Sequence, residues 1–472
     1  MMILSTSTSF DVFLRSAVAN ELTFYLAALV LLVLTAESCI RLLNRDSFGI
    51  TVGVYVTVFA WYFVDPIIYP EEYNYLPSSS LGQGYGQVLL FLIGFRLVVP
   101  AAARWILSRR STGVFAMQRV PPEQILIAVG TLWLLLFAIG IYRMGGDVMG
   151  AVFPIDSRAG MTMFLVGGSA TDFLITSASY LFSAVTAFLG MLVFFQRTTL
   201  WRILAGAMFA ITLPYYFLSG TRSGFLAVTL PFIITYLLYG RHLLILKLAI
   251  LAIAFFCLKE GFRFVQVFRL GGFRELLASE NAYELMDERD EDVRTVGLNM
   301  IGELCFVNAY MDSGETSPAY GARYLNELLN FVPRAIWPSK PMLGIDYAIW
   351  RGYADDSELG VNTTIASGMI GGGVLNFGQI LGPVAASILM AIWAGLLIRW
   401  WEQRKSLLRL ALFMLGAGLT FNLGRDITLL VLWPVVFAYF FTRLTEIWAT
   451  RRFYALPQTP TVAPADARPA LV

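Results

Sequence analysis

Residues 122–142, PEQILIAVGTLWLLLFAIGIY, decide the fold class of this chain. The run contains one charged residue, Glu123, which stands near its start. About 20 consecutive apolar residues are needed for an α-helix to cross the roughly 30 Å of hydrocarbon in a bilayer. A helix can lie in lipid because its backbone groups are hydrogen-bonded within the segment. The stretch therefore predicts a transmembrane helix.

The same pattern recurs on both sides of this stretch. Hydrophobic residues make up 57% of the 472-residue chain and charged residues only 14%, whereas an average soluble protein is roughly 25% charged. This composition excludes a disordered chain, a nucleic-acid-binding module and, with three cysteines, a disulfide scaffold. We expect an all-α polytopic membrane protein with about 11 transmembrane helices. The ten further apolar runs are residues 20–40, 47–69, 85–103, 171–196, 201–218, 223–240, 243–260, 378–400, 407–423 and 426–447.

The basic residues assign a direction to these helices. With the C-terminus inside, eighteen Lys and Arg residues fall in the inner connections and the tail, and five fall in the short outer segments. Cytoplasmic loops carry an excess of Lys and Arg, so we expect the N-terminus outside and the C-terminus in the cytoplasm. The run at 20–40 is too long for the apolar core of a cleavable signal peptide, so we expect it to be retained.

The spacing of the runs divides the chain into four parts. Residues 1–260 hold helices one to eight, 261–363 form a large outer loop, 364–447 hold helices nine to eleven, and 448–472 form a disordered tail. A loop of that length is a functional element or is disordered. Its spaced apolar residues favour order, and residues 320–332 predict an amphipathic helix that lies along the membrane surface.

Three of the five arginines in the short outer segments are candidates for a functional role, because the positive-inside rule does not explain basic residues there. Arg222 lies in the turn 218–224, LSGTRSG, Arg425 lies in 424–426, GRD, and Arg158 follows Asp156 and Ser157 in the outer loop before the fifth run. Small neighbours let backbone amides approach a ligand, and a guanidinium offers a fork for paired phosphate oxygens. A single such arginine is explained equally well by a salt bridge or a lipid headgroup.

Two further cations lie in the large loop within residues 330–341, NFVPRAIWPSKP. Three prolines fix the backbone around Arg334 and Lys340. Together with the arginines of the short turns, these cations predict a binding site for a multiply charged anion at the outer face. A lipid-linked pyrophosphate is the leading candidate. The acidic cluster at 287–292 lacks the spacing of a calcium loop, so we predict no metal there.

These motifs resemble those of the bacterial Wzy family, the O-antigen and exopolysaccharide polymerases that join oligosaccharide repeat units. The resemblance covers about residues 210–435, and the proline-framed Arg/Lys phrase is its most specific part. The first 200 residues match only in being hydrophobic. The motifs that carry the resemblance are SGTRSG at 219–224, FVPRAIWPSKP at 331–341, SGMIGGGVLNFG at 367–378 and GRD at 424–426.

The resemblance implies an activity and a setting. Such enzymes share a multispan glycosyltransferase (GT-C-like) architecture with the O-antigen ligases of lipopolysaccharide synthesis. They work at the periplasmic face of the bacterial inner membrane, without a metal, nucleotide sugar or other cofactor. They transfer a growing glycan from undecaprenyl pyrophosphate to a new lipid-linked repeat unit and release undecaprenyl pyrophosphate. Implied partners are the lipid-linked oligosaccharides, the bilayer, a chain-length regulator and a flippase, but no nucleic acid.

The acceptor hydroxyl needs a general base or an oriented hydrogen-bond acceptor. The chain has one histidine, His242, which the topology places inside. Ligases usually carry a histidine in the large loop, so its absence favours a polymerase. The base is then a carboxylate: Glu303, in an apolar stretch, or Asp346, after the proline-framed phrase. Each could equally be the salt-bridge partner of an arginine.

Two other functions fit the sequence less well. One is a ligase or another transferase of lipid-linked glycans. The other is a transporter or lipid flippase, which would need ionisable residues near the middle of the membrane. Only Asp65 and Arg96 are candidates for that role, and each lies near the end of an apolar run.

Overall fold

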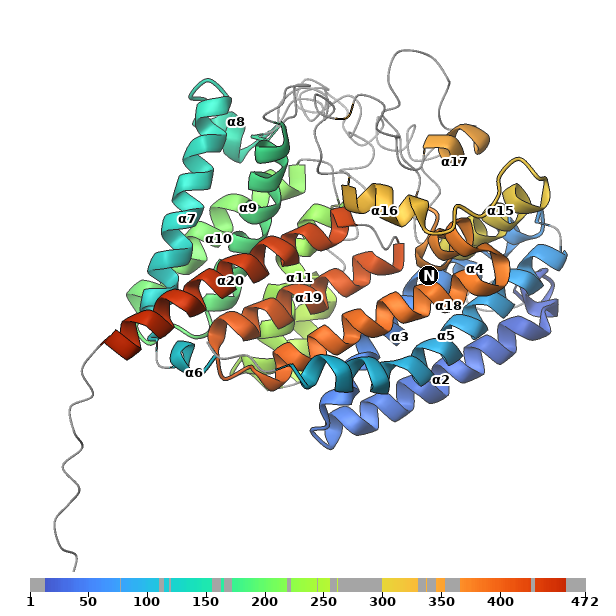
Figure 1. Cartoon of the computed structure of the whole chain (residues 1–472), viewed down its shortest axis with the longest axis horizontal. Helices are drawn as coiled ribbons and strands as arrows, with labels where there is room; N and C mark the ends of the chain where they lie inside the picture. Colours follow the sequence, from blue (N-terminus) through green and yellow to red (C-terminus); the bar gives the residue numbers. More distant parts are fainter. Residues whose placement is uncertain are drawn as a thin grey trace, which may run out of the picture.

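A computed structural model gives the structure of the chain (Figure 1). It describes residues 13–76, 78–109, 114–118, 120–154, 163–164, 172–218, 222–243, 245–254, 261, 299–329, 337, 345–352, 366–425 and 429–455. Within these ranges every regular element is a helix and there is no strand, which confirms the all-α prediction.

The helices fall into three groups along the chain. The first group is η1 (Val18–Asn20), α2 (Leu22–Leu43), η2 (Ser47–Thr51), α3 (Val52–Tyr62), α4 (Val64–Ile68), η3 (Pro70–Tyr73), α5 (Ser78–Leu107) and α6 (Val114–Met117). The second is α7 (Pro122–Arg143), α8 (Val148–Val152), α9 (Asp172–Leu192), α10 (Thr199–Leu218) and α11 (Arg222–Tyr239). The third is α15 (Met300–Asp312), α16 (Ala322–Leu328), α17 (Ile345–Trp350), α18 (Met369–Glu402), α19 (Leu407–Arg425) and α20 (Leu429–Ala455).

Six of these helices are long and apolar enough to cross a membrane: α2, α5, α7, α10, α18 and α19. Shorter apolar helices occupy Ser47–Tyr62, Ser177–Leu192, Gly224–Tyr239 and Ile245–Ala254. The outer surface of α2 carries large exposed side chains such as Leu22, Leu29 and Leu32. An exposed apolar surface of this extent is a contact surface for lipid or protein. These features indicate a membrane protein.

Contacts between α2, α5 and α18 show that these three helices run in the same direction. Near one end of α2, a Cβ on Gly82 of α5 would lie 2.9 Å from the carboxylate of Glu21. Towards the other end, Arg96 of α5 pairs with Glu37 at 2.8 Å. Helices α5 and α18 meet at Gly94 and Ser387, and again further along both helices at Ala103 and Gly395.

Helix α19 runs antiparallel to α18. The indole nitrogen of Trp393 donates to Thr420 Oγ1 at 3.0 Å, and Gly416 packs against Leu397 and Trp400. Residue numbers therefore rise along one helix as they fall along the other. At the end where α19 begins, Arg409 is buried and bonded by two nitrogens to the carboxylate of Glu446 in α20, each at 2.6 Å. The relative helix directions agree with the alternation that the sequence predicts.

Helix α18 contains the span expected at 378–400 and extends it in the N-terminal direction. It begins at Met369 and is interrupted at Gly378, whose φ is +81° and ψ 176°. This backbone conformation favours glycine. Gly373 and Gly382, on either side of the break, approach so closely that neither has room for a Cβ. The chain therefore turns back on itself at Gly378, and the Gly-rich segment forms a short helix packed against the long one.

Helix α15, from the predicted outer loop, is packed into the bundle instead of lying outside it. Its side chains Ile301, Leu304 and Val307 are fully buried. The side-chain amides of Asn308 and Gln87 in α5 donate to each other at 3.0 and 2.9 Å. A reciprocal amide pair satisfies both buried groups, so burial costs little. The segment is therefore ordered, as the spaced apolar residues of the predicted loop indicate, and it packs against α5.

Helix α16 covers only part of the predicted amphipathic helix at 320–332. It ends at Leu328, and Leu325 and Leu328 are both exposed. Exposed leucines are what a helix lying along a membrane surface needs. Val332, the last residue of the predicted apolar face, lies outside the described residues.

Candidate functional site

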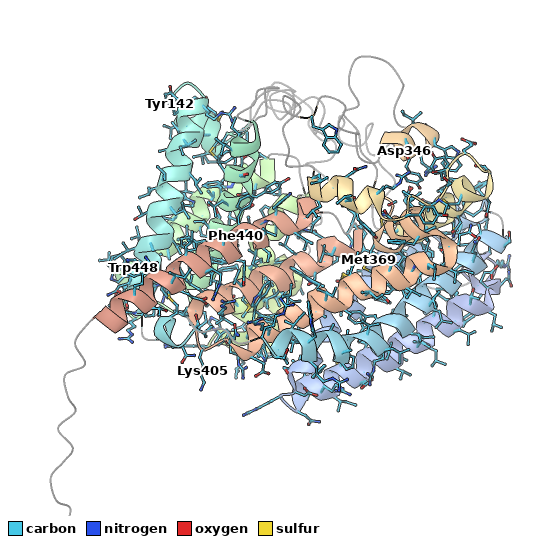
Figure 2. All side chains as sticks on the ribbon, in the orientation of Figure 1. Tyr142, Asp346, Met369, Lys405, Phe440 and Trp448 are labelled. Carbon is cyan, nitrogen blue, oxygen red and sulfur yellow. The ribbon has the colours of Figure 1, made fainter. Side chains whose placement is uncertain are left out.

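Described residues of two segments that the topology places outside lie on the same side of the bundle. In Figure 2, Tyr142 at the end of α7 and Asp346 on α17 lie along the upper side, while Lys405, between α18 and α19, lies along the lower side. His242 follows the lower end of α11, the end opposite Arg222. The side that carries Asp346 is where the sequence predicts the anion site.

Arg425 is the last residue of α19 and is exposed at this end. The residue before it, Gly424, is packed so tightly against Thr57 and Trp61 of α3 that a Cβ would not fit. The indole nitrogen of Trp61 also donates to the carbonyl oxygen of Phe421 at 2.6 Å. The end of α19 is therefore locked on α3. Among the described residues, the guanidinium of Arg425 has no hydrogen-bond or ion-pair partner.

Arg222 is the first residue of α11, which packs antiparallel on α19. A Cβ on Gly418 of α19 would lie 3.0 Å from Pro231 of α11 and 3.1 Å from Leu230. Arg425 follows Gly418 by seven residues, and Arg222 precedes Leu230 by eight. At about 1.5 Å per residue, the two arginines stand at nearly the same level, at the same end of the bundle. The other predicted phosphate-binding residues, Arg158, Arg334 and Lys340, lie outside the described residues, as does the acidic cluster at 287–292.

Glu303, a predicted base, is joined to two residues near α17. Tyr347 donates its hydroxyl to Glu303 Oε2 at 2.6 Å. Arg351 donates from Nη2 to Oε1 at 3.2 Å and from Nε to Oε2 at 3.4 Å. The side chains of Glu303 and Arg351 are 14% and 15% exposed. The guanidinium of Arg351 also lies over the ring of Phe306, 3.5 Å from its centroid.

Asp346, the other predicted base, is paired in the same way. It bonds with both oxygens to the guanidinium of Arg323 in α16, and Nη1 lies 3.2 Å from Oδ1. In this structure, Glu303 and Asp346 therefore each form a salt bridge with an arginine, which is the alternative role that the sequence left open. The two arginines, Arg323 and Arg351, were not singled out from the sequence, because nothing local distinguishes them from other loop arginines.

A cavity of about 450 Å³ lies between the segment 72–80 and α15. This volume is within the range of roughly 300–1,000 Å³ for small-molecule sites. One wall is the connection between α4 and α5. The other is the face of α15 on which Gly302, Phe306 and Ala309 recur at helical spacing. The lining residues are Glu72, Tyr73, Tyr75, Leu76, Ser80, Asn299, Gly302, Cys305, Phe306 and Ala309.

A buried hydrogen-bond chain supports the floor of this cavity. Tyr73 Oη lies 2.8 Å from Asp65 Oδ2 and 2.6 Å from Asn299 Oδ1. Asn299 Oδ1 also accepts from the backbone nitrogen of Gly302 at 2.8 Å, which caps α15 and fixes the amide orientation. The Tyr73 hydroxyl is the donor, and its one proton is shared between the Asp65 carboxylate and the Asn299 amide oxygen.

A carboxyl group and a thiol line the cavity, those of Glu72 and Cys305. Desolvation beside the cavity raises the pKa of the Glu72 carboxyl, whose residue is exposed at the cavity mouth, and the carboxyl of Asp65 raises it further. Burial also raises the pKa of the Cys305 thiol to about 12, so this cysteine is an inert part of the wall. Glu72 was not among the predicted site residues. Its only sequence signal was the turn Pro70-Glu71-Glu72 between two apolar runs.

Within the described ranges, no group of three His, Cys, Asp or Glu side chains could hold a metal ion. Comparisons of the chain with models of protein families, with curated proteins and with solved structures found no match.

Proposed function

We propose that the protein is a membrane glycosyltransferase of the Wzy type, which polymerises undecaprenyl-pyrophosphate-linked oligosaccharide repeat units. In this proposal the chain spans the bacterial inner membrane about eleven times in a GT-C-like arrangement. Its N-terminus is periplasmic and its C-terminus cytoplasmic, and the reaction takes place at the periplasmic face. The support from sequence is the set of constrained outer cations and the resemblance of residues 210–435.

One observation carries the proposal: the ends of α11 and α19 bring Arg222 and Arg425 to the same end of the bundle as the cavity beside α15. Arg425 is exposed and is positioned by the packing of Gly424 on α3. A guanidinium fixed in this way can neutralise charge that develops on a leaving pyrophosphate, without the cost of reorganising the protein. The arrangement suits a substrate with a pyrophosphate at one end and a sugar at the other.

The first test uses a bacterial strain from which the gene for this protein has been deleted. We expect cells lacking the protein to carry single repeat units on lipid or on the lipopolysaccharide core, and complementation to restore the ladder of long glycans on a gel. Cells that attach no glycan at all would identify a ligase instead. An unchanged ladder would refute both enzymes.

Arginine variants supply the second test. Arg425→Ala should abolish the polymer while the protein remains in the membrane. Arg404→Ala is the matched control, because Arg404 is also exposed but lies between α18 and α19, at the opposite end of the bundle. Equal loss of polymer in both variants would show that the effect is not specific to the proposed site.

A further inference from the structure

The cavity beside α15 contains a carboxylate and an amide nitrogen that have no partner among the described residues. The carboxylate of Glu72 makes no hydrogen bond or ion pair there, and neither does the amide nitrogen of Asn299. Asn299 cannot turn this nitrogen away from its position, because its oxygen is bonded to Tyr73 and Gly302. The cavity therefore presents an acceptor and a fixed donor.

The remainder of the lining is mostly apolar and aromatic. Tyr75, which is 91% exposed, lines the cavity together with Phe306 and Leu76. A sugar ring fits such a lining, since its hydroxyl groups pair with the acceptor and the donor while its apolar face packs on an aromatic ring. A phosphate would be repelled by Glu72. An isoprenoid chain would leave Glu72 and Asn299 desolvated without partners, which is unfavourable.

We propose that this cavity binds the acceptor sugar of the lipid-linked repeat unit, and that Glu72 is the general base that removes the proton from the acceptor hydroxyl. This inference rests on the polymerase function proposed above. It assigns the base to a residue other than the two carboxylates suggested by the sequence.

Bond formation and bond breaking balance in this reaction. The acceptor oxygen forms a bond to the anomeric carbon of the donor glycan while its proton passes to the Glu72 carboxylate. The bond between that carbon and the pyrophosphate oxygen breaks, and the electron pair leaves with undecaprenyl pyrophosphate. Glu72 later returns its proton to solvent, to which the cavity is open through the exposed Tyr75. The fixed guanidiniums neutralise the leaving group.

Glu72 suits this role better than Glu303 or Asp346. Each of those carboxylates is held by a guanidinium, at Arg351 and Arg323 respectively. A carboxylate in an ion pair is a weaker base, because the paired cation stabilises its charged form. The carboxyl of Glu72 has the opposite environment, in which desolvation beside the cavity raises its pKa. A raised pKa brings a carboxylate nearer to the operating pH, where general-base catalysis is most efficient.

Phe306 connects this cavity with the ion pair on the other side of α15. One part of its ring lines the cavity, and the guanidinium of Arg351 lies 3.5 Å from the ring centroid. The cavity wall is therefore supported by Arg351, which Glu303 in turn holds in place. Glu303 and Arg351 are positioning residues in this proposal.

The test uses the full-length protein in lipid discs, supplied with lipid-linked repeat units extracted from the deletion strain. Glu72→Gln keeps the shape of the side chain but removes the base. We expect kcat to fall by about 10²- to 10⁴-fold, the usual contribution of a general base, with KM for the acceptor little changed. The matched control is Glu71→Gln, since Glu71 is the adjacent residue and lies outside the cavity. This control should retain the activity of the unmodified protein.

A second variant tests binding separately. Tyr75→Ala should raise KM for the acceptor and leave kcat largely intact, since it removes a stacking surface but no reacting group. Binding of the repeat-unit oligosaccharide, released from lipid by mild acid, shows that a variant is folded. Glu72→Gln should bind this probe as the unmodified protein does.

The outcomes separate the two proposals. Polymerisation by the unmodified protein with full activity in Glu72→Gln would overturn the assignment of the base and leave the polymerase intact. A fall in kcat equal in Glu71→Gln and Glu72→Gln would overturn it as well. If the unmodified protein makes no polymer and the deletion strain keeps its ladder, the polymerase function itself fails.

Discussion

Arg351 donates two hydrogen bonds to Glu303 across the packing interface between α15 and the residues that follow α17, with Nη2 3.2 Å from Oε1. Tyr347 donates a third, at 2.6 Å. Glu303 precedes both partners by more than forty positions in the sequence. The three side chains hold α17 and the residue Arg351 that follows it against the helix that lines the cavity. The carboxylate that the sequence suggested as a base is thus a structural anchor in this geometry.

This anchor can be measured by a double-mutant cycle on Glu303→Gln and Arg351→Gln. Both side chains are largely buried, and residues in direct contact show coupling energies of about 0.5–3 kcal/mol. We expect a coupling towards the upper part of that range, because two charge-assisted hydrogen bonds join the residues. Chemical unfolding in detergent gives the energies. Additive effects would show that the pair does not hold the loop.

Substitution of Gly424 should displace Arg425 without changing its charge. Gly424→Ala adds a methyl group where Thr57 and Trp61 leave no room, which should cost about 1–3 kcal/mol of stability and sharply reduce polymer length. Gly53→Ala is the matched control, since Gly53 lies in α3 and a Cβ added there would meet nothing within 4 Å. Polymer length on a gel and thermal unfolding are the measurements. Full activity of Gly424→Ala would contradict the role given to this contact.

In the amide pair of Gln87 and Asn308, removing one partner should destabilise the protein more than replacing both partners by apolar residues. Asn308→Ala leaves a buried amide without its partner, which costs about 1–3 kcal/mol. Replacing both residues by leucine removes both polar groups, and should cost less than the single change. The melting temperature of each variant in detergent checks this order. A double variant that is less stable than Asn308→Ala would refute it.

Conservative replacement of the outer arginines should fail to restore function. Alanine at Arg222, Arg334 or Arg425 is expected to abolish polymerisation. Lysine at the same positions should rescue it poorly, because an ammonium group cannot form the paired contacts of a guanidinium with phosphate oxygens. Glycan profiling of complemented deletion strains provides the measurement. Full-length polymer from all three alanine variants would remove the basis of the anion site.

The raised pKa of Glu72 predicts the pH dependence of the reaction. Only the deprotonated carboxylate can act as a base, so the rate should increase with pH as Glu72 loses its proton. Desolvation beside the cavity and, to a smaller extent, the Asp65 carboxyl move this increase above the usual range of a glutamate. The same shift favours the protonated folded state, so this contribution to stability is present at low pH and is lost as pH rises through the folded pKa. The pH profile of kcat, compared between the unmodified protein and Asp65→Asn, tests the sign: the variant should reach half its maximal rate at a lower pH.

The sequence by itself determined the membrane class, the all-α architecture and the relative directions of the helices. The length of an apolar run is a local property of the sequence, because the thickness of the bilayer sets it. The Lys and Arg residues of each connection indicate on which side of the membrane that connection lies. The break at Gly378 was anticipated only as a Gly-rich segment. Its consequence, a short helix folded back on α18, depends on how closely Gly373 and Gly382 approach each other.

Only the tertiary structure decided which residues meet at the candidate site. The sequence did not indicate that Glu303 pairs with Arg351, that Asp346 pairs with Arg323, or that Glu72 and Asn299 line one cavity. The partners of a charged side chain depend on contacts between segments far apart in the chain, and these carry no local periodicity. Helix α15 shows the same limit, since the sequence predicted order in the large loop but not the amide bonds that join Asn308 to Gln87 of α5. Hydropathy reports how much of a segment avoids water, but not which neighbour covers it.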